Sequence, residues 1–193
     1  LAALMYVTRD WCVDLMLGPQ FAGAVPIFAW LSVGAILQPF SSTTAWLFIS
    51  QGRGRELLYW GAVSSAISTA SFLAGLPWGP IGVAAAYVGS GVVIRAPVLV
   101  YWVTRSGPVR ARDILAAAKL PAFLGAVVFA VLQLFRSTSA IETSVVGLAV
   151  AAAIAAVSWL AALMITPNGR AQLTYLVNLL KGTVADKLQV ASQ

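Results

Sequence analysis

The sequence predicts an all-α integral membrane protein, a polytopic helical bundle with about five complete transmembrane helices and one truncated helix. Of its 193 residues, 60% are apolar and 9% are charged, whereas an average soluble domain carries roughly 25% charged residues. The mean hydropathy is +0.89, and the two uncharged stretches 15–52 and 57–94 each contain 38 residues. A helix needs about 20 mostly apolar residues to cross a bilayer, so both stretches are too long for buried helices of a soluble core.

Apolar runs and the residues that interrupt them give the order of the predicted helices. The truncated helix ends near residue 8, and an interfacial stretch follows over 9–17. A long span then covers 24–50, and Pro39 at its centre should kink it because proline removes one backbone donor. Further spans are expected over 57–76, 81–104, 120–135 and 143–165, of which 120–135 is the shortest.

The loop charges predict an orientation in the membrane. In chain order, the loops between the predicted spans and the C-terminal segment hold none, two, none, four, one and three Lys and Arg residues. Short loops rich in Lys and Arg stay on the cytoplasmic side. We therefore expect the loop at 51–56, the segment 105–119 and the C-terminus to be cytoplasmic, and the loop at 77–80 to face outside.

These boundaries divide the chain into four parts. We expect residues 1–104 to form part of a transmembrane bundle, 105–119 a cytoplasmic connector, 120–165 an additional pair of transmembrane helices and 166–193 a cytoplasmic amphipathic tail. The tail carries apolar residues three or four positions apart, as in a basic helix that lies on an anionic leaflet. A partly disordered tail is the alternative. Because the chain begins without Met, we expect it to be a fragment of a longer protein.

The composition removes several classes of function. There is no His, and Cys12 is the single Cys, so we expect no metal site, no cofactor and no disulfide framework. The basic residues lie in short loops rather than on one face, which argues against a nucleic-acid partner. Membrane enzymes usually carry acidic residues or His at a membrane-facing loop, and the acids near the outer loops are few. We therefore expect no enzymatic activity and no catalytic residue.

Arg95 is a charge inside a predicted span. An arginine there costs about 2.5 to 3.5 kcal/mol on insertion scales and often marks a substrate or ion path. Gly91 and Tyr87 precede it by one and two helical turns; Gly91 leaves space beside the guanidinium, and the Tyr87 ring could stack on a sugar or fill a cavity wall. A guanidinium suits a diphosphate because its planar donors meet two oxygens at once. The alternative is a structural or snorkelling role.

Other polar residues are weaker candidates. Gln38 and Ser42 are four residues apart, so they share a helix face and could line a cavity; alternatively, hydroxyls near a proline satisfy the carbonyls that it frees. Arg53 and Arg55 fix the topology or attract an anionic lipid headgroup at a cytoplasmic mouth. The hydroxyl residues of the span 57–76 form a small-residue surface that favours close helix packing: Ser64, Ser65, Ser68, Thr69 and Ser71.

Several segments together resemble a known family. The runs LGPQF at 17–21, AVPIF at 24–28, WLFISQGR at 46–53 and GLPWGPIGVA at 75–84 are similar to the C-terminal half of bacterial polysaccharide flippases. These are the lipopolysaccharide and exopolysaccharide export proteins of the multidrug, oligosaccharidyl-lipid and polysaccharide exporter superfamily. The resemblance is densest from residue 17 to about residue 101 and is reduced to hydropathy after residue 119.

The resemblance implies a fold and a function. It implies two helical bundles that face each other across a central cavity, with this chain supplying part of the second bundle and, after it, the additional pair of helices. Members move an undecaprenyl-diphosphate-linked sugar repeat unit from the inner to the outer leaflet of the bacterial inner membrane by alternating access. Membrane lipids and a polysaccharide polymerase with its export machinery would be the partners.

The residues fit this implied function. A diphosphate and its sugars cannot cross about 30 Å of hydrocarbon unaided, so a cation and hydrogen-bonding groups are needed. The candidate substrate-binding residues are Arg95, Tyr87, Gln38 and Ser42, and the candidate hinges for alternating access are Pro39 and Pro97. A small-molecule or drug antiporter of the same superfamily and a non-transporting membrane subunit of a polysaccharide assembly complex remain alternatives.

Overall fold

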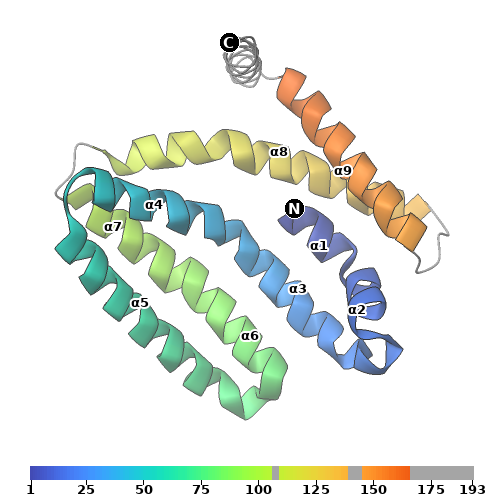
Figure 1. The fold of residues 1–193 in the computed structure, drawn as a ribbon, viewed down its shortest axis with the longest axis horizontal. Coiled ribbons are helices and arrows are strands. Elements are labelled where there is room, and N and C mark those ends of the chain that lie inside the picture. Colours follow the sequence, from blue (N-terminus) through green and yellow to red (C-terminus); the bar gives the residue numbers. More distant parts are fainter. Residues whose placement is uncertain (106–108, 139–144, 166–193) are drawn as a thin grey trace, which may run out of the picture.

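The computed structural model describes residues 1–105, 109–138 and 145–165, and the regular structure in these ranges is helical (Figure 1). The predicted amphipathic tail at 166–193 lies outside the described residues. In chain order the elements are α1 (Ala2–Val7), α2 (Arg9–Leu17), the 3₁₀ turn η1 (Pro19–Ala24), α3 (Val25–Gly34), the 3₁₀ turn η2 (Ala35–Leu37), α4 (Gln38–Ser50), α5 (Gly54–Gly75), the 3₁₀ turn η3 (Leu76–Trp78), α6 (Gly79–Ser90), the π turn η4 (Gly91–Arg95), α7 (Ala96–Arg105), α8 (Ala111–Thr138) and α9 (Val145–Ile165).

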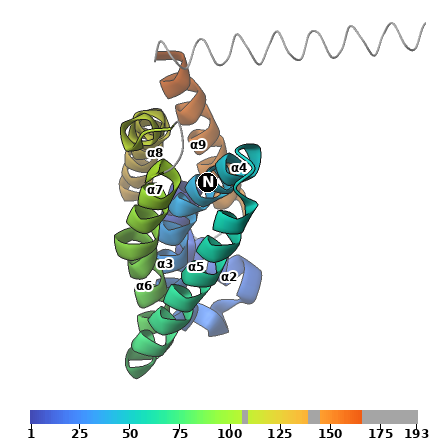
Figure 2. The same ribbon diagram turned by 90° about the vertical axis from the view of Figure 1, so that its left-hand side faces the viewer.

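Within the described residues, four helical runs are long and apolar enough to cross a membrane. The second run, Gly54–Arg105, contains 52 residues and folds back on itself at η3, so that α5 lies beside α6 and α7 (Figures 1 and 2). The number of spans expected from the sequence stays a prediction. The other three runs are Pro19–Ser50, Ala111–Thr138 and Val145–Ile165.

The hairpin between α5 and α6 depends on glycine. Gly79 adopts a φ of 69°, a left-handed conformation that side chains with a Cβ disfavour. A Cβ on Gly75 would lie 2.6 Å from Cα of Val83, and a Cβ on Gly82 would lie 2.4 Å from Cβ of Trp78. The two helices therefore meet backbone to backbone directly after the turn.

Helices α3 and α4 form one long rod that the turn η2 interrupts (Figure 1). The rod packs against α6, where Gly34 faces the side chain of Val88. Near the other end of the rod, the buried Phe48 packs with Leu99 and Val103 of α7. The helices α3 to α7 thus form one packed group.

Helix α8 is longer than the sequence predicted. It contains 28 residues and extends beyond the expected span 120–135 at both ends. The bounds of the part that crosses the membrane stay a prediction. Pro121 lies inside the helix without ending it. At the start of α8, the Asp113 carboxylate accepts a hydrogen bond of 3.0 Å from the backbone N–H of Arg110, which satisfies a donor that the helix start leaves free. Residues 111–119 of the expected connector are therefore helical.

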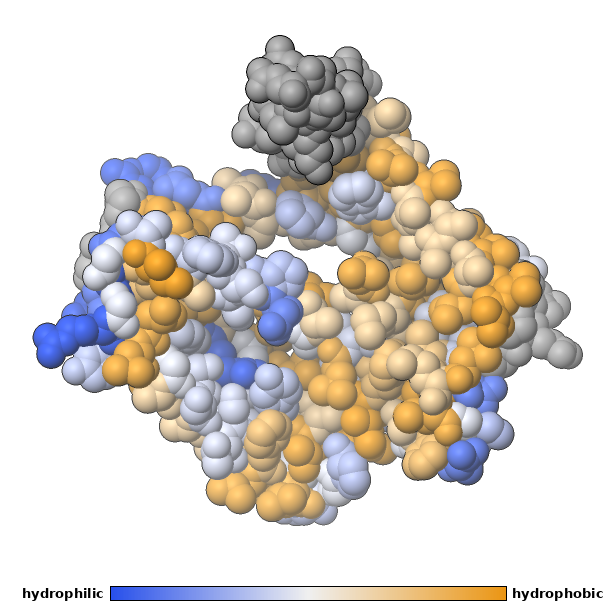
Figure 3. Space-filling model, viewed as in Figure 1, coloured by the Kyte–Doolittle hydropathy of each residue, from blue (hydrophilic) through white to orange (hydrophobic). Residues whose placement is uncertain are grey.

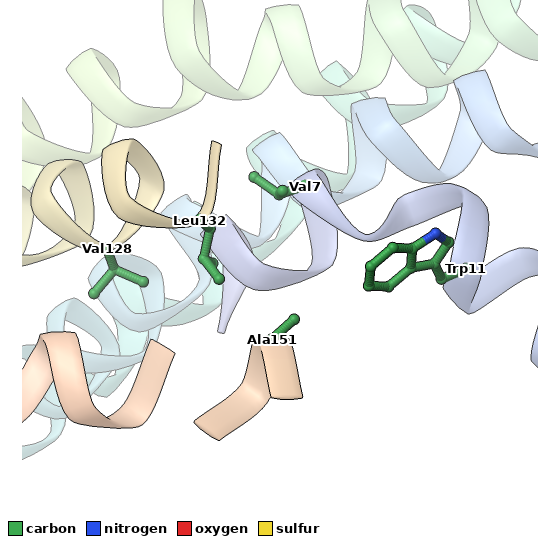
Figure 4. Packing of buried hydrophobic residues seen from close by; sticks show 5 residues of the cluster. All are labelled: Val7, Trp11, Val128, Leu132 and Ala151. Carbon is green, nitrogen blue, oxygen red and sulfur yellow. The ribbon is translucent and has the colours of Figure 1, made fainter. Parts of the chain in front are cut away.

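A buried cluster joins the helices α8 and α9 to the N-terminal helices (Figure 4). Val7 and Trp11 come from α1 and α2, Val128 and Leu132 from α8, and Ala151 from α9. Leu132 is fully buried. The cluster places the C-terminal part of α8 against the N-terminal helices, while Figure 3 shows an opening between α8 and the helices α1 and α4.

An ion pair lies beside this cluster. The Arg136 guanidinium donates to both carboxylate oxygens of Asp10 and to the backbone carbonyl of Val7. Its central carbon also lies 5.4 Å from the ring centroid of Trp11. Arg136 therefore ties the end of α8 to the junction between α1 and α2.

Candidate functional site

Arg95 ends the π turn η4, between α6 and α7. The turn is wide because the backbone N–H of Ala96 donates to the carbonyl of Gly91, five residues earlier. Pro97, two residues after Arg95, has no N–H for the carbonyl of Val93, so the regular ladder of helical hydrogen bonds is interrupted here. The Arg95 side chain reaches back toward Tyr87, in the direction in which Cα–Cβ bonds of a helix are tilted.

Two helices hold the guanidinium of Arg95. Its Nη1 donates to the Ser68 hydroxyl of α5 at 3.1 Å, and its Nη2 donates to the backbone carbonyl of Tyr87 at 3.0 Å. The guanidinium carbon lies 4.3 Å from the centroid of the Tyr87 ring, and that ring stacks on Phe72 of α5 at 5.2 Å. The sequence-predicted pair Arg95 and Tyr87 is thus brought together, with α5 completing the site.

Gly91 provides the room for this arrangement. A Cβ on Gly91 would lie 2.9 Å from Nη2 of Arg95 and 3.3 Å from Cδ1 of Leu37. The glycine therefore leaves space beside the guanidinium, as its spacing in the sequence indicated. Leu37 belongs to η2, so the α3–α4 rod covers the site from a third side.

The positive charge of Arg95 has no acidic partner among the described residues, where the ion pairs are Arg53 with Glu56 and Arg136 with Asp10. Arg95 is half-buried, and its Nε is buried without a hydrogen-bond partner. Burial of a cation is costly unless the charge is paired and hydrogen-bonded. Chemically, the site can therefore accept an anionic or hydrogen-bond-accepting group.

Among the described residues, the hydrogen bonds of Arg95 do not involve Gln38 or Ser42. Both side chains are exposed on α4, on a different face from the buried Phe48 and Thr44. The Ser42 hydroxyl donates to the carbonyl of Gln38 at 3.0 Å. This is the local hydroxyl-to-carbonyl bonding that the sequence analysis gave as the alternative to cavity lining.

The two candidate hinge prolines occupy equivalent positions. Pro39 is the second residue of α4, two positions after the end of the turn η2, and Pro97 is the second residue of α7, two positions after the end of the turn η4. The α3–α4 rod and the rod formed by α6, η4 and α7 therefore both change their helix type two residues before a proline. Whether they bend there during function stays a prediction.

Arg53 and Arg55, the candidate mouth residues, differ in their surroundings. Arg53 donates to the carbonyls of Trp102 at 3.2 Å and Val103 at 3.1 Å, in the last turn of α7. It also pairs with Glu56 at 2.6 Å. Arg53 thus satisfies the free carbonyls at a helix C-terminus, where a cation also stabilises the helix dipole. Arg55 is exposed.

We expect Arg53→Ala to lower the thermal unfolding midpoint of the detergent-solubilised protein by an amount equivalent to about 1 kcal/mol. The reason is the loss of hydrogen bonds that join the loop before α5 to the end of α7. The matched variant Arg55→Ala removes an exposed arginine from the same loop and should leave the midpoint unchanged. Equal shifts in the two variants would show that Arg53 does not brace α7.

The sequence analysis missed two members of the Arg95 site. Ser68 appeared as one of several hydroxyls of a packing surface, and Phe72 was not singled out. They are four residues apart on α5, so the spacing places them on one face. That α5 turns this face toward Arg95 is a tertiary fact that no local signal contains.

The described residues include no group of three or more His, Cys, Asp or Glu side chains that could hold a metal ion.

Many large apolar side chains of the described residues are exposed, and Figure 3 shows them spread over the visible face. A water-soluble monomer rarely exposes so much contiguous apolar surface. Examples on four different helices are Trp46 at 70%, Leu58 at 74%, Leu134 at 64% and Val157 at 66% exposure.

The apolar helical runs and their exposed apolar surface define the class, an all-α membrane protein. Comparison with family models, with curated proteins and with solved structures finds no match for this chain. The resemblance to polysaccharide flippases therefore stands on the sequence motifs alone.

Proposed function

We propose that this chain is part of a carrier that moves an undecaprenyl-diphosphate-linked oligosaccharide repeat unit across the bacterial inner membrane by alternating access. The carried unit would serve polysaccharide biosynthesis. The observation that carries the proposal is Arg95, a cation held between apolar helices without a carboxylate partner in the described part of the chain.

The chemistry of the guanidinium supports a diphosphate ligand. Arginine carries five N–H donors in a planar fork, and the described contacts of Arg95 are one hydrogen bond from each of Nη1 and Nη2. The second N–H of each Nη group would then meet phosphate oxygens, whereas the Nε–H is buried. A planar pair of donors matches two oxygens of one phosphate group better than a lysine ammonium does.

The exposed face of α4 supports a sugar-binding role. Gln38 and Ser42 lie on this face, and α4 borders the opening seen in Figure 3. Amide and hydroxyl groups there would hydrogen-bond the sugar hydroxyls, while the polyprenyl tail stays among the lipids. The exposed Arg55 would attract the anionic headgroup at the cytoplasmic side, where we also place the C-terminus.

The contacts of Arg95 also favour a second candidate, a non-transporting membrane subunit of a polysaccharide assembly complex. In such a subunit the bonds from Arg95 to Ser68 and to the Tyr87 carbonyl would only hold α5 against α6. Loss of Arg95 would then reduce the amount of folded protein without a separate effect on transport. If the chain belonged to a drug antiporter of the same superfamily, loss of Arg95 would not change the amount of surface polysaccharide.

The test replaces Arg95 with Ala and, separately, with Lys in the native protein within its host cells. We expect surface polysaccharide to fall about tenfold or more in Arg95→Ala at unchanged protein level, because charge-assisted hydrogen bonds are each worth about 1.5 to 3 kcal/mol. Lipid-linked repeat units should accumulate inside the cell. Arg95→Lys should be intermediate, because it keeps the charge and loses the planar fork.

Arg112→Ala is the matched control, because it removes an exposed arginine from the start of α8. Normal polysaccharide in both Arg95 variants at normal protein level would refute the proposed role of Arg95. A fall in polysaccharide that only follows a fall in protein level would favour the non-transporting subunit.

A further inference from the structure

Two helical rods are interrupted at the place where they touch. The α3–α4 rod contains the 3₁₀ turn η2, and the α6–α7 rod contains the π turn η4. Leu37 of η2 lies against Gly91 of η4. The two irregular turns therefore face each other, although more than 50 residues separate them in the sequence.

Each interruption has the same backbone cause. Pro39 cannot donate to the carbonyl of Ala35, and Pro97 cannot donate to the carbonyl of Val93, because proline has no N–H. Both carbonyls belong to the irregular turns. In a 3₁₀ or π turn, backbone N–H groups bond to carbonyls three or five residues earlier instead of four. A change of helix type at these turns therefore replaces one set of backbone hydrogen bonds with another and loses few of them. Proline and π turns are also the usual sites of sharp helix kinks.

The contacts between the rods are reciprocal. A Cβ on Gly34 would lie 3.0 Å from Cγ2 of Val88, and a Cβ on Gly91 would lie 3.3 Å from Cδ1 of Leu37. Each rod thus offers one glycine to a side chain of the other rod, and the two contacts are about one helical turn apart in each rod. Val88 is 2% exposed. Such close packing transmits displacement, so a bend in one rod must move the other.

Arg95 connects this pair of turns to a third helix. It is the last residue of η4, and it reaches α5 in two ways: its Nη1 donates to Ser68, and it lies over the Tyr87 ring that stacks on Phe72. A change of helix type in η4 would move the backbone of Arg95 and stretch its bond to Ser68. The guanidinium thus opposes bending of η4.

We propose that η2 and η4 form a single hinge, and that Arg95 latches this hinge to α5 through Ser68. When the latch is closed, both rods keep the geometry described above. When the bond to Ser68 opens, α4 and α7 tilt together relative to α3 and α6. The hinge follows from the packing of the rods and does not depend on what the protein carries.

The first experiment measures the distance across the hinge in the full chain reconstituted in lipid vesicles. Cys12 is replaced with Ala, and nitroxide labels are placed on cysteines at Ile49 of α4 and Ile81 of α6, both of which are exposed. Pulsed electron resonance should show one dominant distance in the parent. In Ser68→Ala the ratio of a second distance to the first should rise about tenfold, the effect of losing one hydrogen bond from a charged donor.

Ser65→Ala is the matched control, because it makes the same change at an exposed site of the same helix and should keep the parent distribution. Gly91→Ala offers a second way to open the latch, since its methyl group would displace the Arg95 guanidinium. Identical distributions in the parent, Ser68→Ala and Gly91→Ala would overturn the latch.

The second experiment tests whether the hinge is single. Pro39→Ala and Pro97→Ala each restore a backbone donor in one rod. In the Ser68→Ala background, each should lower the fraction of molecules that show the second distance. If the hinge is single, combining Pro39→Ala with Pro97→Ala should not lower this fraction further. If the two hinges are separate, the free-energy changes of the two substitutions should add. Pro26→Ala, at the start of α3, is the control. Additive changes would overturn the single hinge. Neither experiment measures transport, so failure of the hinge and failure of the proposed function can be told apart.

Discussion

Replacing Gly75 or Gly82 with alanine is expected to destabilise the protein by about 3 kcal/mol, the upper part of the range for overpacking. The added Cβ of Gly75 would lie 2.6 Å from Cα of Val83 and 2.7 Å from the carbonyl oxygen of Gly82. These are backbone atoms that no change of side-chain rotamer can move. The hairpin between α5 and α6 would have to open, and with it the contact of Ser68 and Phe72 with the Arg95 site.

The matched controls are Gly61→Ala on α5 and Gly89→Ala on α6. No atom lies within 4 Å of a Cβ built on either glycine, and alanine is about 1 kcal/mol more favourable than glycine inside a helix. These two variants should be neutral or slightly stabilising. Thermal unfolding of all four variants in the same detergent checks the prediction, and similar midpoints for the four would contradict the close approach of α5 and α6.

Reversing one charge of the ion pair between Asp10 and Arg136 should have the second large effect. Asp10→Arg places two guanidinium groups together beside the buried Trp11 and leaves Arg136 without its carboxylate. The two side chains are 39% and 33% exposed, so water screens part of the repulsion, and we expect a loss of about 2 kcal/mol. Helices α8 and α9 should then separate from α1 and α2.

The double variant Asp10→Arg, Arg136→Asp is the control for this prediction. It restores opposite charges, so it should recover at least half of the stability that the single reversal loses, as a direct interaction requires. Accessibility of Cys12, two residues after Asp10 on α2, to a thiol reagent reports the separation of the helices. A double variant no more stable than Asp10→Arg alone would contradict a direct pair.

The pH dependence of this pair has a definite sign. Burial raises the pKa of Asp10, but hydrogen bonds from Arg136 and from backbone N–H groups, together with the Arg136 charge, outweigh it and hold the pKa below its ordinary value of 3.8. A depressed pKa in the folded state stabilises the fold above the ordinary pKa, and this contribution is lost as the pH falls through the folded-state pKa. The stability difference between the parent and Asp10→Asn should therefore persist at about pH 5 and disappear only well below pH 3.8.

Local signals predicted much of the secondary structure. The glycines and prolines of 77–80 predicted the tight turn that the structure places at η3 and Gly79. Pro39 marked the point at which the α3–α4 rod changes its helix type. The charges of 105–119 predicted a break between two apolar runs, and α8 begins within that segment at Ala111. Charged residues suit the first turn of a helix as well as a loop, so composition alone did not separate the two.

The candidate site was predicted in part. The spacing of Tyr87, Gly91 and Arg95 placed the three residues on one side of a helix, and the structure brings them together. Spacing also grouped Gln38 with Ser42, and the implied function added both to Arg95 as substrate-binding candidates. In the structure the two residues lie on an exposed face of α4, and the guanidinium of Arg95 bonds to Ser68 and the Tyr87 carbonyl. Spacing within a helix states which residues share a face, whereas it does not state which faces of two helices meet.

By itself, the sequence determined the class of the protein and the presence of an arginine inside an apolar run, because hydropathy, helix length and breakers are properties of contiguous residues. The tertiary structure decided the partners of each charge. Arg95 meets Ser68 across 27 positions, and Arg136 meets Asp10 across 126. Such contacts depend on how the helices turn and cross, which is settled by packing over the whole bundle.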